Sequence, residues 1–383
     1  MSVAVHGRVD PAFRGVRDLF AANLAEGRDL GAAVAVFVRG RAVVDLWGGI
    51  ADDRAARPWE RDTPCPAFSG TKAVTATAVL LAAREAGIDW TGRVTTWWPE
   101  YGAAGKETTT LADLLTHRAG LPAFDRPVTA AEAADPAAMA ARLAGQAPLW
   151  PPGTAHGYHA LTYGWLAGEF VRRRTGETVG RFARRRLGAE LWIGAPAPVI
   201  ARAARVRFPP EHERRWNDPA PLDAGTVAEM AAAFADPASL VTRASVNPAG
   251  SYNNPEVLAG GWPGSGLVTT ARALAGFYRD LTAGRMLAAP DLRAATAEQV
   301  RGRDAVLLLE SAFGLGFMLP SQNFVLPAAA RATAFGHPGA GGAVGLGDLE
   351  HEVAFAFLPN LRRDWLAGDR RAHDLIEQVY AAL

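Results

Sequence analysis

The chain has 383 residues, of which 49% are hydrophobic and 21% charged, and its formal net charge is +1. This composition is typical of a globular protein with a large core, and the balanced charge gives no reason to expect a nucleic-acid partner. No apolar stretch reaches the roughly 18–20 residues that a membrane span needs, so no membrane partner is expected.

The N-terminal part predicts a helix, a strand pair and a buried helix. Residues 10–27 begin with Asp-Pro, carry apolar residues at helical spacing and end in glycine, as a capped amphipathic helix does. Residues 33–38 and 42–47 are apolar runs around a short turn, which indicates a hairpin. Residues 69–86 are apolar on nearly all faces, which is typical of a helix at the centre of a protein.

The middle of the chain predicts mostly helices and irregular loops. We expect the helices at 111–115, 130–145, 161–174 and 269–283. Residues 196–222 are rich in proline and arginine without periodicity, so we interpret them as a long surface loop and a candidate lid over a cleft. We interpret the arginine runs at 172–174 and 184–186 as solvated helix faces rather than nucleic-acid patches.

The C-terminal part predicts strands at 343–346 and 353–358, followed by a terminal helix that ends at Leu383. Because strand pairs lie at both chain ends, we predict an α+β fold with one antiparallel sheet from both ends and the terminal helices on one face. The single domain would have two parts, which are 1–68 with 301–383 and a mostly helical 69–300. The helix at 69–86 would lie at their interface, beside a cleft.

Lysine is almost absent from this chain. Among the 40 lysines and arginines only Lys72 and Lys106 are lysines, and Lys72 follows Ser69 by three residues. Arginine keeps its proton in proteins, whereas a desolvated lysine can lose its proton and accept one from a serine hydroxyl. On a helix these two residues share a face, and the helix start offers N–H groups to a developing oxyanion. An S-x-x-K sequence also occurs by chance, so this pattern alone leaves both interpretations open.

Three further segments accompany this pattern. Their sequences are Leu114-Leu115-Thr116-His117-Arg118-Ala119-Gly120-Leu121-Pro122, Tyr158-His159-Ala160 after Trp150-Pro151-Pro152-Gly153, and Gly336-His337-Pro338-Gly339-Ala340-Gly341-Gly342. Together with the S-x-x-K sequence they resemble the serine β-lactamase and penicillin-binding-protein superfamily, most closely the class C β-lactamase-like carboxylesterases (family VIII esterases). The resemblance extends from about residue 10 to the C-terminus and implies the β-lactamase/transpeptidase-like fold.

The resemblance also implies residue roles. Ser69 would be the acylated nucleophile, Lys72 its proton acceptor or modulator, and Tyr158 a partner base whose pKa the nearby ammonium lowers. Which of Lys72 and Tyr158 is the general base stays open. The oxyanion hole would be the backbone N–H groups of Ser69 and Ala340. The expected substrate-binding residues are His337, Gly339 and Ala160.

Two departures from the β-lactamase pattern favour esters as substrates. Ala160 stands where many β-lactamases have asparagine, and His337 stands where they have the lysine that opens the third motif. We therefore expect a carboxylesterase for short-chain or aryl esters with weak or no β-lactamase activity. The alternatives are an acyltransferase or transesterase of secondary metabolism, a D-amino-acid peptidase, and a catalytically inactive interaction protein of the same fold.

The remaining motifs predict no cofactor and no metal. His156 and His159 are only three residues apart and have no third ligand, and neither a nucleotide-binding glycine motif nor an H-E-x-x-H motif occurs. Pro263 precedes Gly264-Ser265-Gly266, so the G-x-S-x-G motif of α/β-hydrolases is absent as well. We interpret Lys106 as a solvated loop lysine and His117 as structural.

The expected compartment follows from the first ten residues and the cysteine content. The first ten residues lack the apolar core of a secretion signal. Cys65 is the single cysteine, so no internal disulfide can form, and we interpret it as a structural thiol. We therefore expect a cytoplasmic protein.

Overall fold

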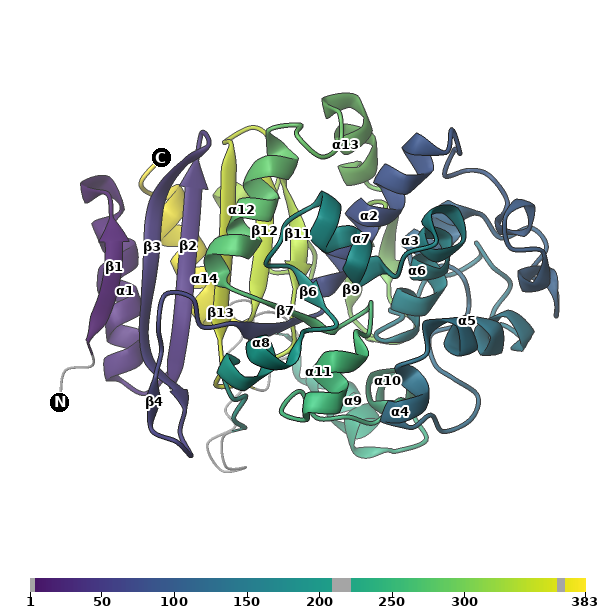
Figure 1. Cartoon of the computed structure of the whole chain (residues 1–383), viewed down its shortest axis with the longest axis horizontal. Coiled ribbons are helices and arrows are strands. Elements are labelled where there is room, and N and C mark those ends of the chain that lie inside the picture. Colours follow the sequence, from purple (N-terminus) through teal and green to yellow (C-terminus); the bar gives the residue numbers. More distant parts are fainter. Residues whose placement is uncertain (1–3, 209–221, 364–368) are drawn as a thin grey trace.

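The computed structural model describes residues 4–208, 222–363 and 369–383. A large antiparallel sheet and a mostly helical part lie side by side (Figure 1). None of the helices within these residues combines the length and the apolar character that crossing a bilayer requires.

The large sheet joins strands from both chain ends in the order β1-β3-β2-β13-β12-β11-β10-β9-β8, and β4 pairs with β3. This order confirms the predicted sheet and both predicted hairpins, which are β2–β3 and β12–β13. The strands are β1 (Val5–Val9), β2 (Gly31–Val38), β3 (Arg41–Asp52), β4 (Arg57–Pro58), β8 (Val300–Arg303), β9 (Glu310–Phe313), β10 (Met318–Leu319), β11 (Ala334–Pro338), β12 (Val344–Asp348) and β13 (Val353–Pro359).

Helices cover both faces of this sheet, because alternate residues of each strand point to opposite sides. The terminal helices α1 (Arg14–Ala25) and α14 (Arg370–Tyr380) pack on one face, where Val34 and Val36 belong to their core cluster. The helix α12 (Ala271–Thr282) packs on the other face (Figure 1). The predicted boundary at residue 300 is therefore wrong for α12. The amphipathic pattern of α12 predicts a helix with one buried face, but it does not indicate whether that face packs on the large sheet or within the helical part.

The helical part surrounds α2 and contains a second sheet in the order β5-β7-β6. Its helices are α2 (Thr71–Glu85), α3 (Leu111–Leu115), α4 (Ala130–Ala133), α5 (Pro136–Gly145), α6 (Thr162–Thr175), α7 (Val179–Arg186), α8 (Ala197–Arg202), α9 (Ala224–Ala235), α10 (Leu240–Val246), α11 (Pro255–Gly260) and α13 (Ala289–Thr296). The strands are β5 (Cys65–Phe68), β6 (Trp192–Ile193) and β7 (Leu267–Thr269), and the short 3₁₀ turns are Pro11–Phe13, Val94–Thr96, Pro99–Gly102 and Ala328–Ala330.

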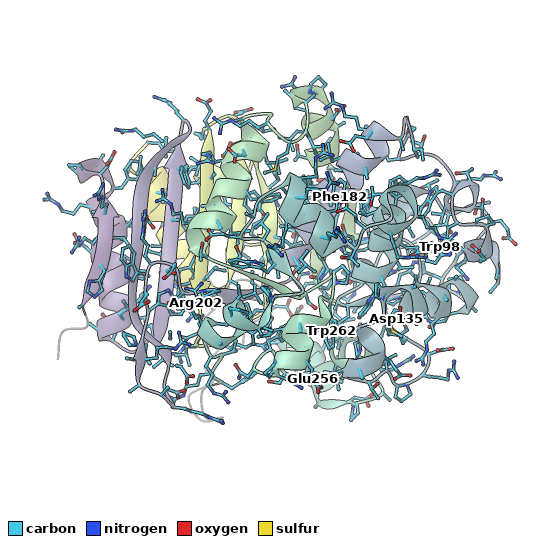
Figure 2. All side chains as sticks on the ribbon, viewed as in Figure 1. Trp98, Asp135, Phe182, Arg202, Glu256 and Trp262 are labelled. Atoms are coloured by element: carbon cyan, nitrogen blue, oxygen red, sulfur yellow. The ribbon has the colours of Figure 1, made fainter. Side chains whose placement is uncertain are left out.

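The predicted central helix is α2, in which all thirteen residues from Thr71 to Ala83 are buried. The predicted helix at 130–145 is instead two helices. It breaks because Pro136 has no N–H and disfavours a helical conformation at Asp135, whose side chain caps α5. Asp135 is labelled in Figure 2. Part of the predicted loop at 196–222 is the helix α8, and residues 209–221, on which its interpretation as a lid depends, lie outside the described residues.

Lys106 is fully buried rather than solvated, because its amine donates to the carbonyls of Ala103 (2.6 Å) and Gln146 (2.5 Å). These two carbonyls accept hydrogen bonds from an amine that the sequence alone would place in solvent. Cys65 is buried in β5, as expected of a structural thiol.

Candidate active site

Ser69 lies in the tight connection from β5 to α2. The helix begins at Thr71 with Gly70 as its N-cap, so Ser69 directly precedes the helix rather than opening it. Phe68 has φ 48°, a left-handed conformation that a bulky side chain adopts only under constraint. The hydroxyl of Thr71 supplies that constraint by donating to the Phe68 carbonyl and accepting from the Leu267 N–H. This turn leaves Ser69 partly exposed beside the first turn of α2.

Lys72 is fully buried beneath Ser69. Its Nζ lies 3.1 Å from Ser69 Oγ and donates to the carbonyl oxygens of Ala160 (2.7 Å) and Gly264 (2.8 Å). Burial lowers the pKa of Lys72 well below its usual value. A neutral amine has two N–H donors and one lone pair. The two carbonyls match the donors, so the lone pair is left for the hydroxyl of Ser69.

Close glycine packing brings the Gly264 carbonyl to Lys72. A Cβ on Gly164 of α6 would lie only 2.1 Å from the Gly264 nitrogen, so neither the helix nor the loop tolerates a larger residue there. Thr75 anchors the same loop by donating to the Pro263 carbonyl at 2.6 Å. The Gly-Ser-Gly segment thus supports Lys72 through its backbone.

Tyr158 lies against both residues and is almost fully buried. Lys72 Nζ is 4.7 Å from the centre of its ring, which stacks on Phe313 at 6.3 Å. Burial raises the pKa of Tyr158, and its hydrogen bond with Ser69 opposes this only in part. The predicted lowering of this pKa by an ammonium is therefore wrong. Burial disfavours the phenolate and also the cation on Lys72 that was expected to stabilise it.

A buried polar network positions Tyr158, and the sequence analysis missed it. Asp304 Oδ1 accepts hydrogen bonds from the backbone N–H groups of Tyr158, Val306 and Leu307, each at 2.9 Å. Its Oδ2 accepts from Ser311 Oγ at 2.8 Å, and Ser311 lies 3.0 Å from His156 Nε2. Nothing in the sequence around Asp304 distinguishes it from a surface aspartate, because its partners come from distant segments.

The predicted oxyanion donors lie where β5 and β11 approach each other. A Cβ on Gly339 would lie 2.3 Å from the Ala67 carbonyl, so only glycine lets the ends of the two strands meet. This contact brings the turn that carries Ala340 beside Ser69. Neither the N–H of Ser69 nor that of Ala340 donates to an acceptor within the described part of the chain. Both donors are therefore free to bind an oxyanion.

Of the predicted substrate-binding residues, His337 and Gly339 line the cavity at Ser69 and Ala160 does not. His337 is buried, and its Nδ1 donates to the Pro338 carbonyl at 2.7 Å. Burial lowers the pKa of His337 to about 3, so the ring is neutral at pH 7. Ala160 contributes the carbonyl that holds Lys72.

His159 and His117 have structural partners near the site. His159 donates through Nδ1 to the Gly157 carbonyl and accepts through Nε2 from the Leu121 N–H, and its own N–H donates to His117. These bonds agree with a structural His117. The described residues contain one cluster with possible metal ligands, His373, Asp374 and Glu377 on α14, in which Asp374 also pairs with Arg370.

A cavity of about 180 Å³ opens at Ser69 and Tyr158. Its wall is largely apolar and comes from the segment before β11, from β11 and β12, and from α14. The apolar lining includes Leu307, Met318, Phe324, Val325, Leu326, Val344, Ala372 and Ile376. A small apolar group attached to a carbonyl at Ser69 fits this lining.

Comparison with known proteins gives one family and several close relatives. The Beta-lactamase family model matches residues 16–379. The chain is 33% identical over 376 residues to "Esterase/beta-lactamase LipL" of Mycobacterium tuberculosis (strain ATCC 25618 / H37Rv), covering 93% of this chain and 83% of the relative.

Solved structures agree with this result. A family VIII carboxylesterase has a TM-score of 0.87 at 32% identity, covering 99% of this chain and 100% of that one. A penicillin-binding protein homologue from Caulobacter crescentus has a TM-score of 0.85 at 36% identity, covering 99% of this chain and 100% of that one. EstA from Arthrobacter nitroguajacolicus Rue61a has a TM-score of 0.84 at 30% identity, covering 100% of this chain and 98% of that one.

The Asp304 network yields a testable prediction. Asp304→Ala leaves two buried N–H groups and one part-buried N–H group without an acceptor, so we expect it to lower the free energy of unfolding by about 3 kcal/mol or more. Asp304→Asn keeps Oδ1 as an acceptor and should lower the free energy of unfolding much less. Urea unfolding of the two variants measures the difference. Equal stabilities would show that Oδ1 does not hold this segment.

Proposed function

This chain belongs to the Beta-lactamase family and is a serine hydrolase, and we propose that it cleaves short-chain or aryl carboxylic esters through an acyl-enzyme on Ser69. One observation carries the proposal. The hydroxyl of Ser69 lies 3.1 Å from the amine of Lys72, which is buried and whose two other contacts are carbonyl acceptors. A neutral lysine in this position is a proton acceptor for the serine.

In the first half of the reaction, Ser69 Oγ bonds to the ester carbonyl carbon while its proton moves to Lys72. The carbonyl oxygen becomes an oxyanion and accepts hydrogen bonds from the N–H groups of Ser69 and Ala340. The bond from carbon to the alcohol oxygen then breaks. The departing alkoxide takes the proton from the Lys72 ammonium through the hydroxyl of Tyr158, which is hydrogen-bonded with Ser69 and whose ring centre lies 4.7 Å from Lys72 Nζ.

In the second half, water replaces the alcohol. It gives a proton to Lys72 through Tyr158 and bonds to the acyl carbon, and the oxyanion forms again in the same hole. When the bond to Ser69 Oγ breaks, that oxygen takes its proton back from Lys72. The acid leaves, and Ser69 and Lys72 return to their starting protonation states.

The site also supports esters over β-lactams. His337 is neutral, and Ala160 has no side-chain amide, so neither supplies the cation or the amide of the β-lactamase pattern. The carboxylesterase of known structure and EstA are consistent with this choice.

We expect kcat/KM for a nitrophenyl butyrate to exceed that for nitrocefin by about 10–10²-fold, because a lost charged hydrogen bond costs about 1.5–3 kcal/mol. Hydrolysis rates of both chromogenic substrates by the same preparation measure this ratio. A ratio near one would contradict the proposed ester preference.

Replacing the nucleophile tests the acyl-enzyme. We expect Ser69→Ala to lower kcat for a nitrophenyl ester by about 10⁴-fold or more, because no other group can form the acyl bond. A fluorophosphonate probe should add one mass increment to the wild type at Ser69 and none to this variant. Ser265→Ala, in the segment that supports Lys72, is the matched control and should still be labelled. A label on any other residue would refute the assignment.

The role of Lys72 is tested by charge and by pH. Lys72→Arg keeps a cation but removes the base, so we expect kcat to fall by about 10²–10⁴-fold. Lys106→Arg changes the only other lysine and should keep wild-type kcat per folded molecule. In the wild type, kcat/KM should fall as pH drops through the lowered pKa of Lys72, because the protonated amine cannot accept a proton. Near-normal turnover by Lys72→Arg would show that only the charge matters.

A further inference from the structure

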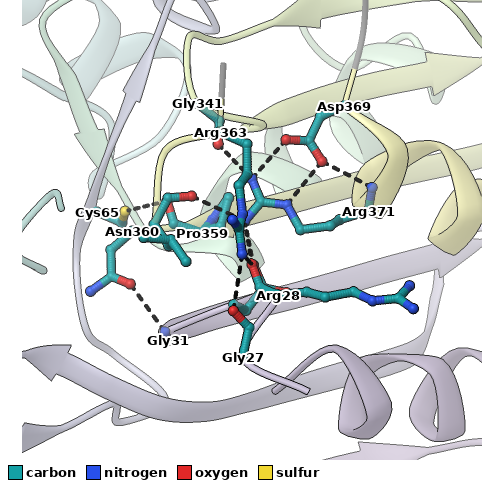
Figure 3. Close-up of polar contacts among 12 residues, drawn as sticks. Gly27, Arg28, Gly31, Cys65, Gly341, Pro359, Asn360, Arg363, Asp369 and Arg371 are labelled. Carbon is teal, nitrogen blue, oxygen red and sulfur yellow. Dashed lines mark hydrogen bonds and ion pairs between the residues drawn. The ribbon is translucent and has the colours of Figure 1, made fainter. Parts of the chain in front are cut away.

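The start of α14 holds a buried ion cluster directly behind the turn that carries Ala340 (Figure 3). We define the Arg371 cluster as Arg371, Asp29 and Asp369, whose side chains are at most 5% exposed. Arg371 contacts Asp369 with two nitrogens, at 2.9 and 2.7 Å, and Asp29 with a third at 2.7 Å. The cluster therefore joins α14 to the loop between α1 and β2.

Arg371 also holds the oxyanion turn, which comprises residues 339–342. Its Nη2 donates to the Gly341 carbonyl at 2.8 Å (Figure 3). A Cβ on Gly342 would lie 2.4 Å from Asp369 Oδ2 and 2.5 Å from Arg371 Nη2, so the turn packs directly on the ion pair. The remaining donor capacity of the guanidinium is used by the carbonyls of Arg28 (3.2 Å) and Leu361 (3.0 Å).

The backbone bonds of the turn lie at its base. The Gly342 N–H donates to the Gly339 carbonyl at 3.2 Å and the Gly339 N–H donates to the Ala343 carbonyl at 2.6 Å, but the Gly341 carbonyl takes part in neither bond. Gly341 has φ 91° and lacks a side chain, so the peptides on both sides of it could rotate at little cost. The bond from Arg371 fixes the Gly341 carbonyl, and with it the orientation of the turn that begins at Ala340.

We propose that Arg371 is a positioning residue of the oxyanion hole, because its guanidinium fixes the turn and thereby the direction of the Ala340 N–H. This inference rests on the proposed function, since an oxyanion forms only if Ser69 attacks a carbonyl. Stability alone does not account for the cluster, because a buried ion pair is often no more stable than packed apolar residues. Lysine is a poor replacement for arginine, since its three N–H donors lie on one nitrogen, whereas the guanidinium uses three separate nitrogens to reach Gly341, Asp369 and Asp29.

The test compares Arg371→Lys with Asp29→Asn. Arg371→Lys keeps the charge but loses the planar guanidinium that contacts Gly341 and both aspartates. As for a weakened oxyanion donor, kcat for a nitrophenyl ester should fall by about 10–10²-fold and KM should stay within about threefold of the wild type. The inhibition constant of a boronic acid, which binds Ser69 as a tetrahedral adduct, should rise by a similar factor. Asp29→Asn disturbs the same cluster but keeps Oδ1 as an acceptor, so it should lower Tm and leave kcat within about twofold.

Unchanged kcat in Arg371→Lys would overturn the inference. So would losses of kcat that follow Tm alike in both variants, because they would indicate a purely structural role. If Arg371→Lys does not fold, the kcat of Gly342→Ala tests the inference instead. It keeps every charge but pushes the turn off the cluster, and it should lower kcat in the same way.

A second readout separates this inference from the proposed function. The rate at which a fluorophosphonate labels Ser69 also depends on the oxyanion hole and needs no ester turnover. If the wild type is labelled but hydrolyses no ester, the proposed ester activity fails. Slower labelling of Arg371→Lys would still support the positioning role, and equal labelling rates would contradict it.

Discussion

The burial of one lysine amine beneath a serine hydroxyl is the constraint on which the site depends. A charged amine in a fully buried position is costly unless it is paired with a carboxylate, and the hydrogen-bond partners of Lys72 are a hydroxyl and two neutral carbonyls. Burial therefore favours the neutral amine, whose lone pair would be available to Ser69. Both carbonyls belong to backbone that other packing holds in place, at Ala160 before α6 and at Gly264 against Gly164.

The two parts of the fold supply different halves of this chemistry. The helical part carries Ser69, Lys72 and Tyr158, which are the proposed nucleophile and proton path. The large sheet carries the turn with Ala340 at the end of β11, and the Gly339 contact with Ala67 joins it to β5. Asp304 and Arg371 each hold one of these two segments through buried hydrogen bonds. Asp304 holds the backbone of Tyr158, and Arg371 holds the turn.

Much of this arrangement could be predicted from the sequence, because the signals are local or belong to a set of motifs. The family and the fold are confirmed, and so are both hairpins and the central helix, since their apolar patterns fit one kind of element. The predicted residues Ser69, Lys72 and Tyr158 lie together, although Ser69 precedes the helix instead of opening it.

The rest depends on contacts between distant segments. The carbonyl of Gly264 has no side-chain signal, and Asp304 and Arg371 resemble surface charges until their partners are known. Burial also reversed two expectations, because the sequence does not reveal desolvation. Tyr158 has a raised pKa instead of a lowered one, and Lys106 is enclosed by carbonyls instead of solvent.

The scarcity of lysine allows a direct test of the central claim, which is that Lys72 is neutral in the free enzyme. Protein labelled with ¹³C and ¹⁵N at lysine should give only two side-chain signals in an NMR spectrum, and Lys72→Met assigns them by removing one. We predict that the Lys72 signal has the shift of a neutral amine at pH 7 and titrates far below the usual lysine pKa. A Lys72 signal that stays protonated up to about pH 10 would contradict the account.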